Sequence, residues 1–282
     1  MQFRKLGNSG AVVTAYALGT MTFGAESDEA VSRRLLDDYV NAGGNFIDTA
    51  DVYNKGVSEQ IIGRWLDDNK GMRDRLVIAS KGRFATGDGP NDIGLSRRHL
   101  GAALDASLKR LRIEQIDLYQ THAFDALTPV EETLRFLDDA IRAGKIAYYG
   151  FSNYTGWQLT KAVHVARASG FAAPVTLQPQ YNLLARDIEH EIVPAVLDAE
   201  MGILPWSPLG GGWLTGKYKR DQMPKGTTPL GEHPHRGVEA FRPPNAAERT
   251  GALVRGPATA ARAPSATMAP TPPAMLRATP PI

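Results

Sequence analysis

Residues 45–56 read NFIDTADVYNKG, and this stretch decides how the rest of the chain is interpreted. The apolar pair Phe46-Ile47 suits a short buried strand, and it stops at a carboxylate, Asp48. Tyr53 follows among asparagine, lysine and glycine residues that favour turns. In parallel sheets, functional side chains gather just past the C-terminal ends of the strands. The stretch therefore predicts a strand whose end carries an acid and a phenol into a functional site.

Short apolar runs rich in β-branched residues recur along the chain, separated by longer segments of helical periodicity. This alternation predicts an α/β fold with a parallel sheet. The expected strands are 16–19, 45–48, 76–80, 115–121, 146–151, 175–178 and 202–206. The expected helices are 28–42, 58–69, 96–111, 129–143, 155–168 and 188–199. Ser96, and Thr128 before Pro129, are expected to cap the helices that they precede.

Two further runs, residues 3–6 and 12–14, flank the sequence Gly-Asn-Ser-Gly and predict an N-terminal β-hairpin. Such a hairpin is suited to plugging the bottom of a barrel. The seven strand and helix units that follow predict a (β/α)8 TIM barrel that lacks its eighth strand. A doubly wound sheet is the alternative, but the turn after the first strand, in ALGTMTFG, has no G-x-G-x-x-G pattern.

Polar side chains follow three adjacent strands of the expected barrel. Asp48 and Tyr53 come after the second strand, Lys81 after the third and His122 after the fourth. Taken singly, each residue has an ordinary structural explanation as a turn, surface or partly buried side chain. Together they bring an acid, a phenol, an amine and an imidazole to one mouth of the barrel. We therefore expect these four residues to be catalytic.

This tetrad suits proton delivery to a carbonyl oxygen. A free tyrosine has a pKa of about 10, and a neighbouring ammonium such as Lys81 is expected to lower it. Asp48 would keep Lys81 charged and oriented, and His122 would orient and polarise the carbonyl. The chain has no cysteine, and we expect no metal site. The electrons for a reduction must then come from a cofactor.

Seven stretches of the chain together resemble the aldo-keto reductase family, in particular bacterial members related to voltage-gated potassium-channel β-subunits. They are LGTMTFG (18–24), NFIDTADVYNKGVSEQIIGRWL (45–66), ASK (79–81), RLRIEQIDLYQTH (110–122), GKIAYYGFSNY (144–154), QPQYNLL (178–184) and PWSPLGGGWLTGKY (205–218). The resemblance covers roughly residues 3–249. It implies a (β/α)8 barrel that binds NADPH across its C-terminal mouth. NADH stays open as an alternative, because no segment that would grip the 2'-phosphate of NADPH is recognisable.

The resemblance also implies roles for individual residues. Tyr53 would be the general acid, Asp48 and Lys81 its tuning pair, and His122 the residue that orients the carbonyl. The expected cofactor contacts are Gly19, Thr20, Met21, Asp48, Ser152, Asn153, Gln178, Trp206, Ser207, Pro208, Leu209, Gly210 and Lys217. Phe23, Tyr53 and Trp206 are expected to line an apolar pocket for an aldehyde or ketone. The small-molecule carbonyl itself is not identified by the sequence.

Composition narrows the class of protein. Hydrophobic residues make up 43% and charged residues 22%, as in ordinary globular proteins. The N-terminus lacks an apolar signal segment and no long apolar run occurs, so we expect a cytoplasmic protein without membrane association. Removing the four arginines after Glu248 from the 32 basic residues leaves 28, against 30 acidic residues. The basic excess therefore belongs to the C-terminal tail, and we expect no nucleic-acid partner. Oligomeric state stays open.

The C-terminal tail departs from the family pattern. Residues 250–282 contain seven prolines and no acidic or aromatic residue, so they are expected to form a disordered, low-complexity segment. The expected domain division is an incomplete barrel at 1–249 and this tail. The tail is either a natural extension or the product of a reading-frame shift, and the abrupt change in composition favours the second. A barrel without its eighth strand is expected to be unstable or to bind NADPH weakly.

Two other functions compete with carbonyl reduction. One is a cofactor-binding regulatory subunit like the channel β-subunits. The other is a lyase in which Lys81 forms a Schiff base, although Asp48 would hold the amine charged and poorly nucleophilic.

Overall fold

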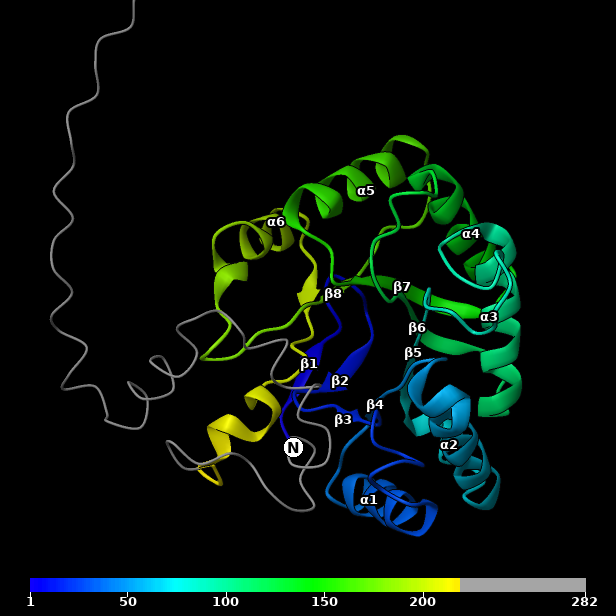
Figure 1. Ribbon diagram of the computed structural model, residues 1–282, viewed down its shortest axis with the longest axis vertical. Coiled ribbons are helices and arrows are strands. Elements are labelled where there is room, and N and C mark those ends of the chain that lie inside the picture. The colour runs from blue at the N-terminus through cyan, green and yellow to red at the C-terminus, as the bar shows by residue number, and fades with distance from the viewer. Residues whose placement is uncertain (219–282) are drawn as a thin grey trace, which may run out of the picture.

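The computed structural model describes residues 1–218, in which a parallel sheet is surrounded by helices (Figure 1). The sheet strands are β3 (Leu18–Gly19), β4 (Phe46–Asp48), β5 (Val77–Gly82), β6 (Ile116–Thr121), β7 (Ile146–Ser152), β8 (Thr176–Gln178) and β9 (Gly202–Ile203). The helices are α1 (Glu29–Asn41), α2 (Val57–Asp68), α3 (Arg97–Leu111), α4 (Val130–Arg142), α5 (Gly156–Ala168) and α6 (Ile192–Asp198). Short 3-10 turns are η1 (Tyr53–Gly56), η2 (Arg73–Arg75), η3 (Asp187–Glu189) and η4 (Gly210–Thr215).

The seven strands lie side by side in chain order, and every neighbouring pair is parallel. The sheet curls, and α1 to α6 follow its outer side (Figure 1). This arrangement confirms the barrel-type α/β fold and excludes the doubly wound alternative, which needs helices on both faces. Within residues 1–218, the two end strands β3 and β9 are not paired with each other, so the sheet is an open part of a barrel. The expectations about an eighth strand and the tail lie outside the described residues.

An N-terminal hairpin plugs the floor of the curled sheet, as expected. It consists of β1 (Phe3–Lys5) paired with β2 (Val12–Thr14), and it lies inside the curve of the strands (Figure 1). Apolar side chains of the hairpin pack against the lower ends of the sheet strands, in a cluster of Leu6, Val13, Phe46, Ala79, Leu118 and Val175. Gly7 has a φ of +58°, and a Cβ there would come within 1.9 Å of the Val175 carbonyl oxygen. Only glycine therefore fits this turn.

Alternation along the strands divides the sheet into an outer and an inner face. Outward residues such as Ile47, Ile78 and Leu177 are fully buried and join the helices in the main core. Inward residues near the strand ends are polar, and they include Asp48, Lys81 and Gln178. The inner face of the sheet thus carries polar and charged side chains at its C-terminal edge, while the apolar side chains of the outer face pack against the helices.

Several boundaries differ from those expected. β3 and β9 are shorter than the runs 16–19 and 202–206, and α6 begins at Ile192 rather than at 188. Ser96 caps α3 as expected, since its side chain accepts a hydrogen bond from the His99 N–H. Thr128 does not cap α4, because its hydroxyl is bonded to Asp125 and Pro129 is the capping residue. None of the helices in the described residues is long and apolar enough to span a bilayer.

Candidate active site

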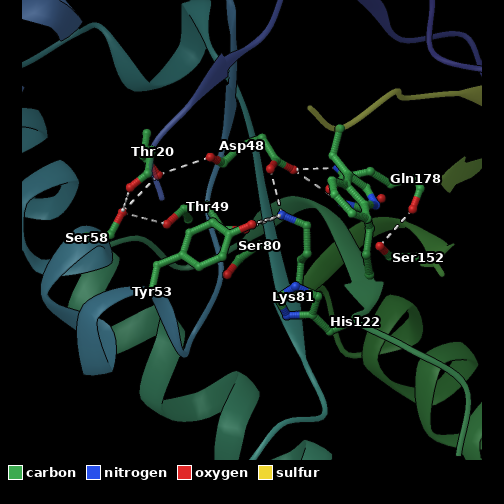
Figure 2. Close-up of polar contacts among 12 residues, drawn as sticks. Thr20, Asp48, Thr49, Tyr53, Ser58, Ser80, Lys81, His122, Ser152 and Gln178 are labelled. Carbon is green, nitrogen blue, oxygen red and sulfur yellow. Dashed lines mark hydrogen bonds and ion pairs between the residues drawn. The ribbon is translucent and has the colours of Figure 1, made fainter. Parts of the chain in front are cut away.

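Lys81 lies at the centre of the polar mouth, completely buried on β5. Its Nζ donates to Asp48 Oδ2 at 2.6 Å, to the Thr49 carbonyl at 2.9 Å and to Tyr53 Oη at 3.2 Å (Figure 2). An ammonium has three protons, and all three are used here. Burial alone would lower the pKa of Lys81, but Asp48 and Tyr53 outweigh it, and the net shift is upward. Lys81 is therefore charged, which disfavours the Schiff-base function.

Tyr53 reaches Lys81 because a tight turn reverses the chain after β4. Asn54 and Lys55 both adopt left-handed backbone conformations, with φ values of 47° and 55°. The Asn54 side chain holds this turn by donating to the Gly24 carbonyl. Burial raises the pKa of Tyr53, and the neighbouring Lys81 opposes this shift without cancelling it. Lys81 therefore acts on the phenol pKa in the expected direction, but burial outweighs it, so the net shift is upward and Tyr53 keeps its proton at neutral pH.

His122 lies on the other side of the phenol, just after β6. Its ring meets the Tyr53 ring edge-on at 5.9 Å between centroids, and the Phe84 ring at 4.7 Å. Burial lowers the pKa of His122 to about 3, assisted by the charges of Lys81 and Arg83, so the imidazole is neutral. Within residues 1–218, Nδ1 is enclosed and has no hydrogen-bond partner. The structure thus brings together the four residues that the sequence placed in one mouth.

Side-chain amides and hydroxyls extend this site toward β7, β8 and β9. Gln178 Nε2 donates to Asp48 Oδ1 at 2.9 Å, while the Ser152 hydroxyl donates to the Gln178 carbonyl at 2.8 Å (Figure 2). Asn153 has a left-handed backbone with φ of 55° and donates to the His122 carbonyl at 2.9 Å. Trp206 Nε1 in turn donates to Asn153 Oδ1 at 2.9 Å. These four expected cofactor contacts therefore form one continuous set with the tetrad.

The remaining expected cofactor contacts lie at the end of β3 and on the loops after β3 and β9. Gly19 is exposed with open space where a Cβ would be, Met21 is exposed, and Thr20 is buried with its hydroxyl bonded to the Asp48 carbonyl. After β9, the loop is exposed or half-buried except at Gly210; its expected contacts are Ser207, Pro208, Leu209, Gly210 and Lys217. These residues are placed around the mouth, and their contact with a cofactor stays a prediction.

Three features of the site differ from the sequence-based expectation. Phe23 is only 1% exposed and belongs to the core shared with the helices, so it does not line an open pocket. Phe84 contacts the His122 ring, although nothing in the sequence pattern singled it out. Gln120 was also missed: it is buried on β6 and its Nε2 lies 3.4 Å from Asp48 Oδ1. Its inward direction follows from strand alternation with Leu118.

The site and the curled sheet agree with a comparison against known families. A family model described as "Aldo/keto reductase family" matches residues 16–250. The chain belongs to the aldo/keto reductase family. The family recognised from the sequence motifs is thereby confirmed, and so is the prediction that the chain is an NAD(P)H-dependent oxidoreductase.

Similar aldo/keto reductases have varied descriptions. "Uncharacterized oxidoreductase YrpG" of Bacillus subtilis is 40% identical over 225 residues, covering 77% of this chain and 69% of that protein. A "Probable voltage-gated potassium channel subunit beta" of Oryza sativa is 40% identical over 226 residues, covering 79% and 69%. "Aryl-alcohol dehydrogenase [NADP(+)]" of Phanerodontia chrysosporium is 34% identical over 206 residues, covering 70% and 52%. The similarity thus extends to proteins described as enzymes and as channel subunits.

Proposed function

We propose that this aldo/keto reductase uses NADPH to reduce aldehydes or ketones to alcohols, with Tyr53 as the general acid. The observation that supports this most strongly is the position of Lys81, whose ammonium donates to both Asp48 and the Tyr53 hydroxyl. A buried ammonium at 3.2 Å from a phenol stabilises the phenolate that forms when the proton leaves. The phenol is thus protonated at rest and able to release its proton when a substrate oxygen becomes negative.

His122 complements the phenol as a neutral hydrogen-bond donor. Its lowered pKa keeps the imidazole uncharged, so it carries a single ring proton. A buried N–H without an acceptor is rarer than a buried lone pair without a donor, and Nδ1 is enclosed without a partner in the described part of the chain. The proton is therefore placed on Nε2. From there it can hydrogen-bond a carbonyl oxygen and fix its position relative to the Tyr53 hydroxyl.

The residues around the mouth suit a nicotinamide cofactor. Bound NADPH would supply the hydride that a carbonyl carbon accepts. Ser152, Asn153 and Gln178 offer hydroxyl and amide groups where a carboxamide needs donors and acceptors, and the half-buried Trp206 indole lies beside Asn153. Gly19 leaves open space where other residues would carry a Cβ. The glycine-rich turn at 210–212, left-handed throughout, and the exposed Lys217 suit phosphate groups.

The test is consumption of NADPH by the purified full chain with a panel of aromatic and aliphatic aldehydes. Tyr53→Phe removes only the hydroxyl, and we expect kcat to fall by at least about 100-fold while NADPH affinity is retained. Tyr16→Phe is the matched control, since Tyr16 is 74% exposed and distant in the sequence from the tetrad. Carbonyl reduction at the wild-type rate by Tyr53→Phe would reject the general-acid role.

The similarity to channel β-subunits supports a second candidate, a cofactor-binding regulatory subunit. The two candidates differ in turnover rather than in cofactor binding. NADPH binding is measured by quenching of tryptophan fluorescence, with Trp206→Phe to identify the responsible indole. Binding without turnover of any carbonyl in the panel would favour the regulatory candidate.

A further inference from the structure

A second group of ionisable side chains is buried directly behind the catalytic mouth. It lies on the helix side of β5 and β6 and consists of Asp51, Glu59, Arg110 and Tyr119. Asp51 is 3% exposed, Glu59 and Tyr119 are fully buried, and the side chain of Arg110 is 21% exposed. The residues come from the loop after β4, from α2, from α3 and from β6. None of them takes part in the proton delivery described above.

Within this group, Glu59 is fully compensated and Asp51 is not. Glu59 Oε2 accepts from Arg110 Nε at 2.7 Å, and Oε1 accepts from the Ser80 hydroxyl at 2.5 Å. Both carboxyl oxygens of Asp51 are enclosed and have no side-chain hydrogen-bond partner among residues 1–218, although the neighbouring Val52 N–H acts weakly on the carboxyl; the hydroxyl of Tyr119 is enclosed without a partner as well. An ionised carboxylate buried in this way is strongly unfavourable, whereas a neutral acid is tolerated. Burial, together with Glu59, raises the pKa of Asp51 to about 7.

The Asp51 carboxyl and the Tyr119 hydroxyl both lie next to Gly82, with no hydrogen bond between them. A Cβ built on Gly82 would lie 2.2 Å from Tyr119 Oη and 3.5 Å from Asp51 Oδ2. A protonated carboxyl can donate to a phenol oxygen, and the phenol can donate to the carboxyl carbonyl. Burial raises the pKa of Tyr119 well above its usual value, so it is the neutral phenol that faces Asp51. A protonated Asp51 and Tyr119 are therefore complementary, while an ionised Asp51 would also face Glu59.

Asp51 is tied to the catalytic residues through the backbone. Its N–H donates to the Lys81 carbonyl at 3.1 Å, and the Tyr53 N–H donates to the Ala50 carbonyl at 3.2 Å. The turn that follows holds three successive left-handed residues, 54–56. Such a conformation persists only where the surroundings enforce it. Movement of Asp51 toward water would therefore displace the segment that presents Tyr53 to Lys81.

We propose that Asp51 is a positioning residue for Tyr53, and that its carboxyl must be protonated for the turn to hold the phenol against Lys81. The groups that face it are Glu59 of α2, Arg110 of α3, Lys81 of β5, Tyr119 of β6 and Tyr53 itself. Loss of the proton leaves a carboxylate beside Glu59 with no side-chain donor, and the loop relaxes to solvate it. The inference rests on the proposed general-acid role of Tyr53.

The experiment is a profile of kcat from about pH 5 to about pH 9 at saturating NADPH and aldehyde. In the wild type, kcat should fall about tenfold through a step near neutral pH as the phenol loses its position. Asp51→Asn keeps the shape and stays uncharged, so the step should disappear. Asp74→Asn, at an exposed aspartate, is the matched control and should keep it. A wild-type step retained in Asp51→Asn overturns the proposal.

Urea unfolding gives a measurement that does not depend on turnover. Between about pH 4 and about pH 7, the wild-type midpoint measured relative to that of Asp51→Asn should fall as pH rises, because the variant keeps every other titrating group, His122 included. If Asp51→Asn fails to fold, Tyr119→Phe is measured in its place. Removing the Tyr119 hydroxyl should move the step in the pH profile of kcat to lower pH. A step at an unchanged pH in Tyr119→Phe rejects the proposal. If the variant reduces carbonyls with the same step in its pH profile of kcat as the wild type, the positioning role of Asp51 is rejected and the proposed function is not. Absence of carbonyl turnover in the wild type rejects the proposed function as well, while the urea data still report the charge of Asp51.

Discussion

Lys81 is a fully buried charge whose stability depends on one counter-ion, Asp48. Asp48→Asn would leave the ammonium without its carboxylate, and Lys81 would lose the interaction that raises its pKa. We expect kcat to fall about 100-fold and the free energy of unfolding to fall by about 3 kcal/mol. Steady-state kinetics and urea unfolding measure the two effects. Asp38→Asn, at an exposed position, is the control, and equal losses in both variants would contradict the argument.

His122 predicts a loss of stability in acid. The unfolded chain binds a proton at the ordinary pKa of about 6.5, whereas the folded protein does so only near about 3. The unfolded state therefore binds more protons at this residue between these values, and the contribution of His122 to stability decreases as pH falls from 6.5 toward 3. The decrease is on the order of 4 kcal/mol. His122→Gln should lose less stability over this range than the wild type, whereas His164→Gln, at an exposed position, should match it.

The two helices next to the site, α2 and α3, touch at a glycine. A Cβ on Gly63 would lie 2.2 Å from the Arg110 carbonyl oxygen, so no side chain fits between the helices. Gly101 of α3 is different, because its Cβ would meet only Phe136, at 3.8 Å. Gly63→Ala should therefore destabilise the protein by about 1 to 2 kcal/mol despite the better helix propensity of alanine. Gly101→Ala should stabilise it by up to about 1 kcal/mol, and urea unfolding of both variants tests the contrast.

The order and type of the elements were predictable because alternating strand and helix patterns are local properties of the sequence. The boundaries of the helices and strands were less predictable. The helix expected at 188–199 would have placed Pro194 in its interior, where a missing N–H and a ring clash are costly; α6 instead begins at Ile192, with the proline in its first turn. The capping role assigned to Thr128 failed because Asp125 lies close enough to take its hydroxyl. Such competition between side chains depends on the folded loop.

At the scale of the molecule, the tetrad was predictable because strand ends of a parallel sheet share one edge. That rule alone was enough to predict that Asp48, Lys81 and His122 lie close together. Phe84 and Asp51 did not follow from it, since the direction of a loop side chain is set by the path of the loop. Phe84 contacts His122, whereas Asp51 lies next to Gly82, near the Tyr119 hydroxyl.

A truncation tests how much of the chain the enzyme needs. Residues 250–282 contain no aromatic or acidic residue and seven prolines, a composition that supplies little to a core. A chain that ends at Arg249 should therefore keep the unfolding midpoint and the NADPH affinity of the full chain. A chain that ends at Tyr218 should lose affinity, because the family similarity continues to residue 250. A lower unfolding midpoint for the chain that ends at Arg249 than for the full chain would show that residues 250–282 contribute to folding.

The hairpin at the floor has a consequence for the order of folding. Within residues 1–218, each strand of the seven-stranded sheet is bonded only to strands adjacent in the chain, so this sheet can grow one unit at a time as synthesis proceeds. Gly7, by contrast, lies against Val175 and Gly202, near the other end of the described chain. The contacts of this turn with β8 and β9 can therefore form only after those strands have been synthesised. We therefore expect the hairpin to complete its packing late in the assembly of the described residues.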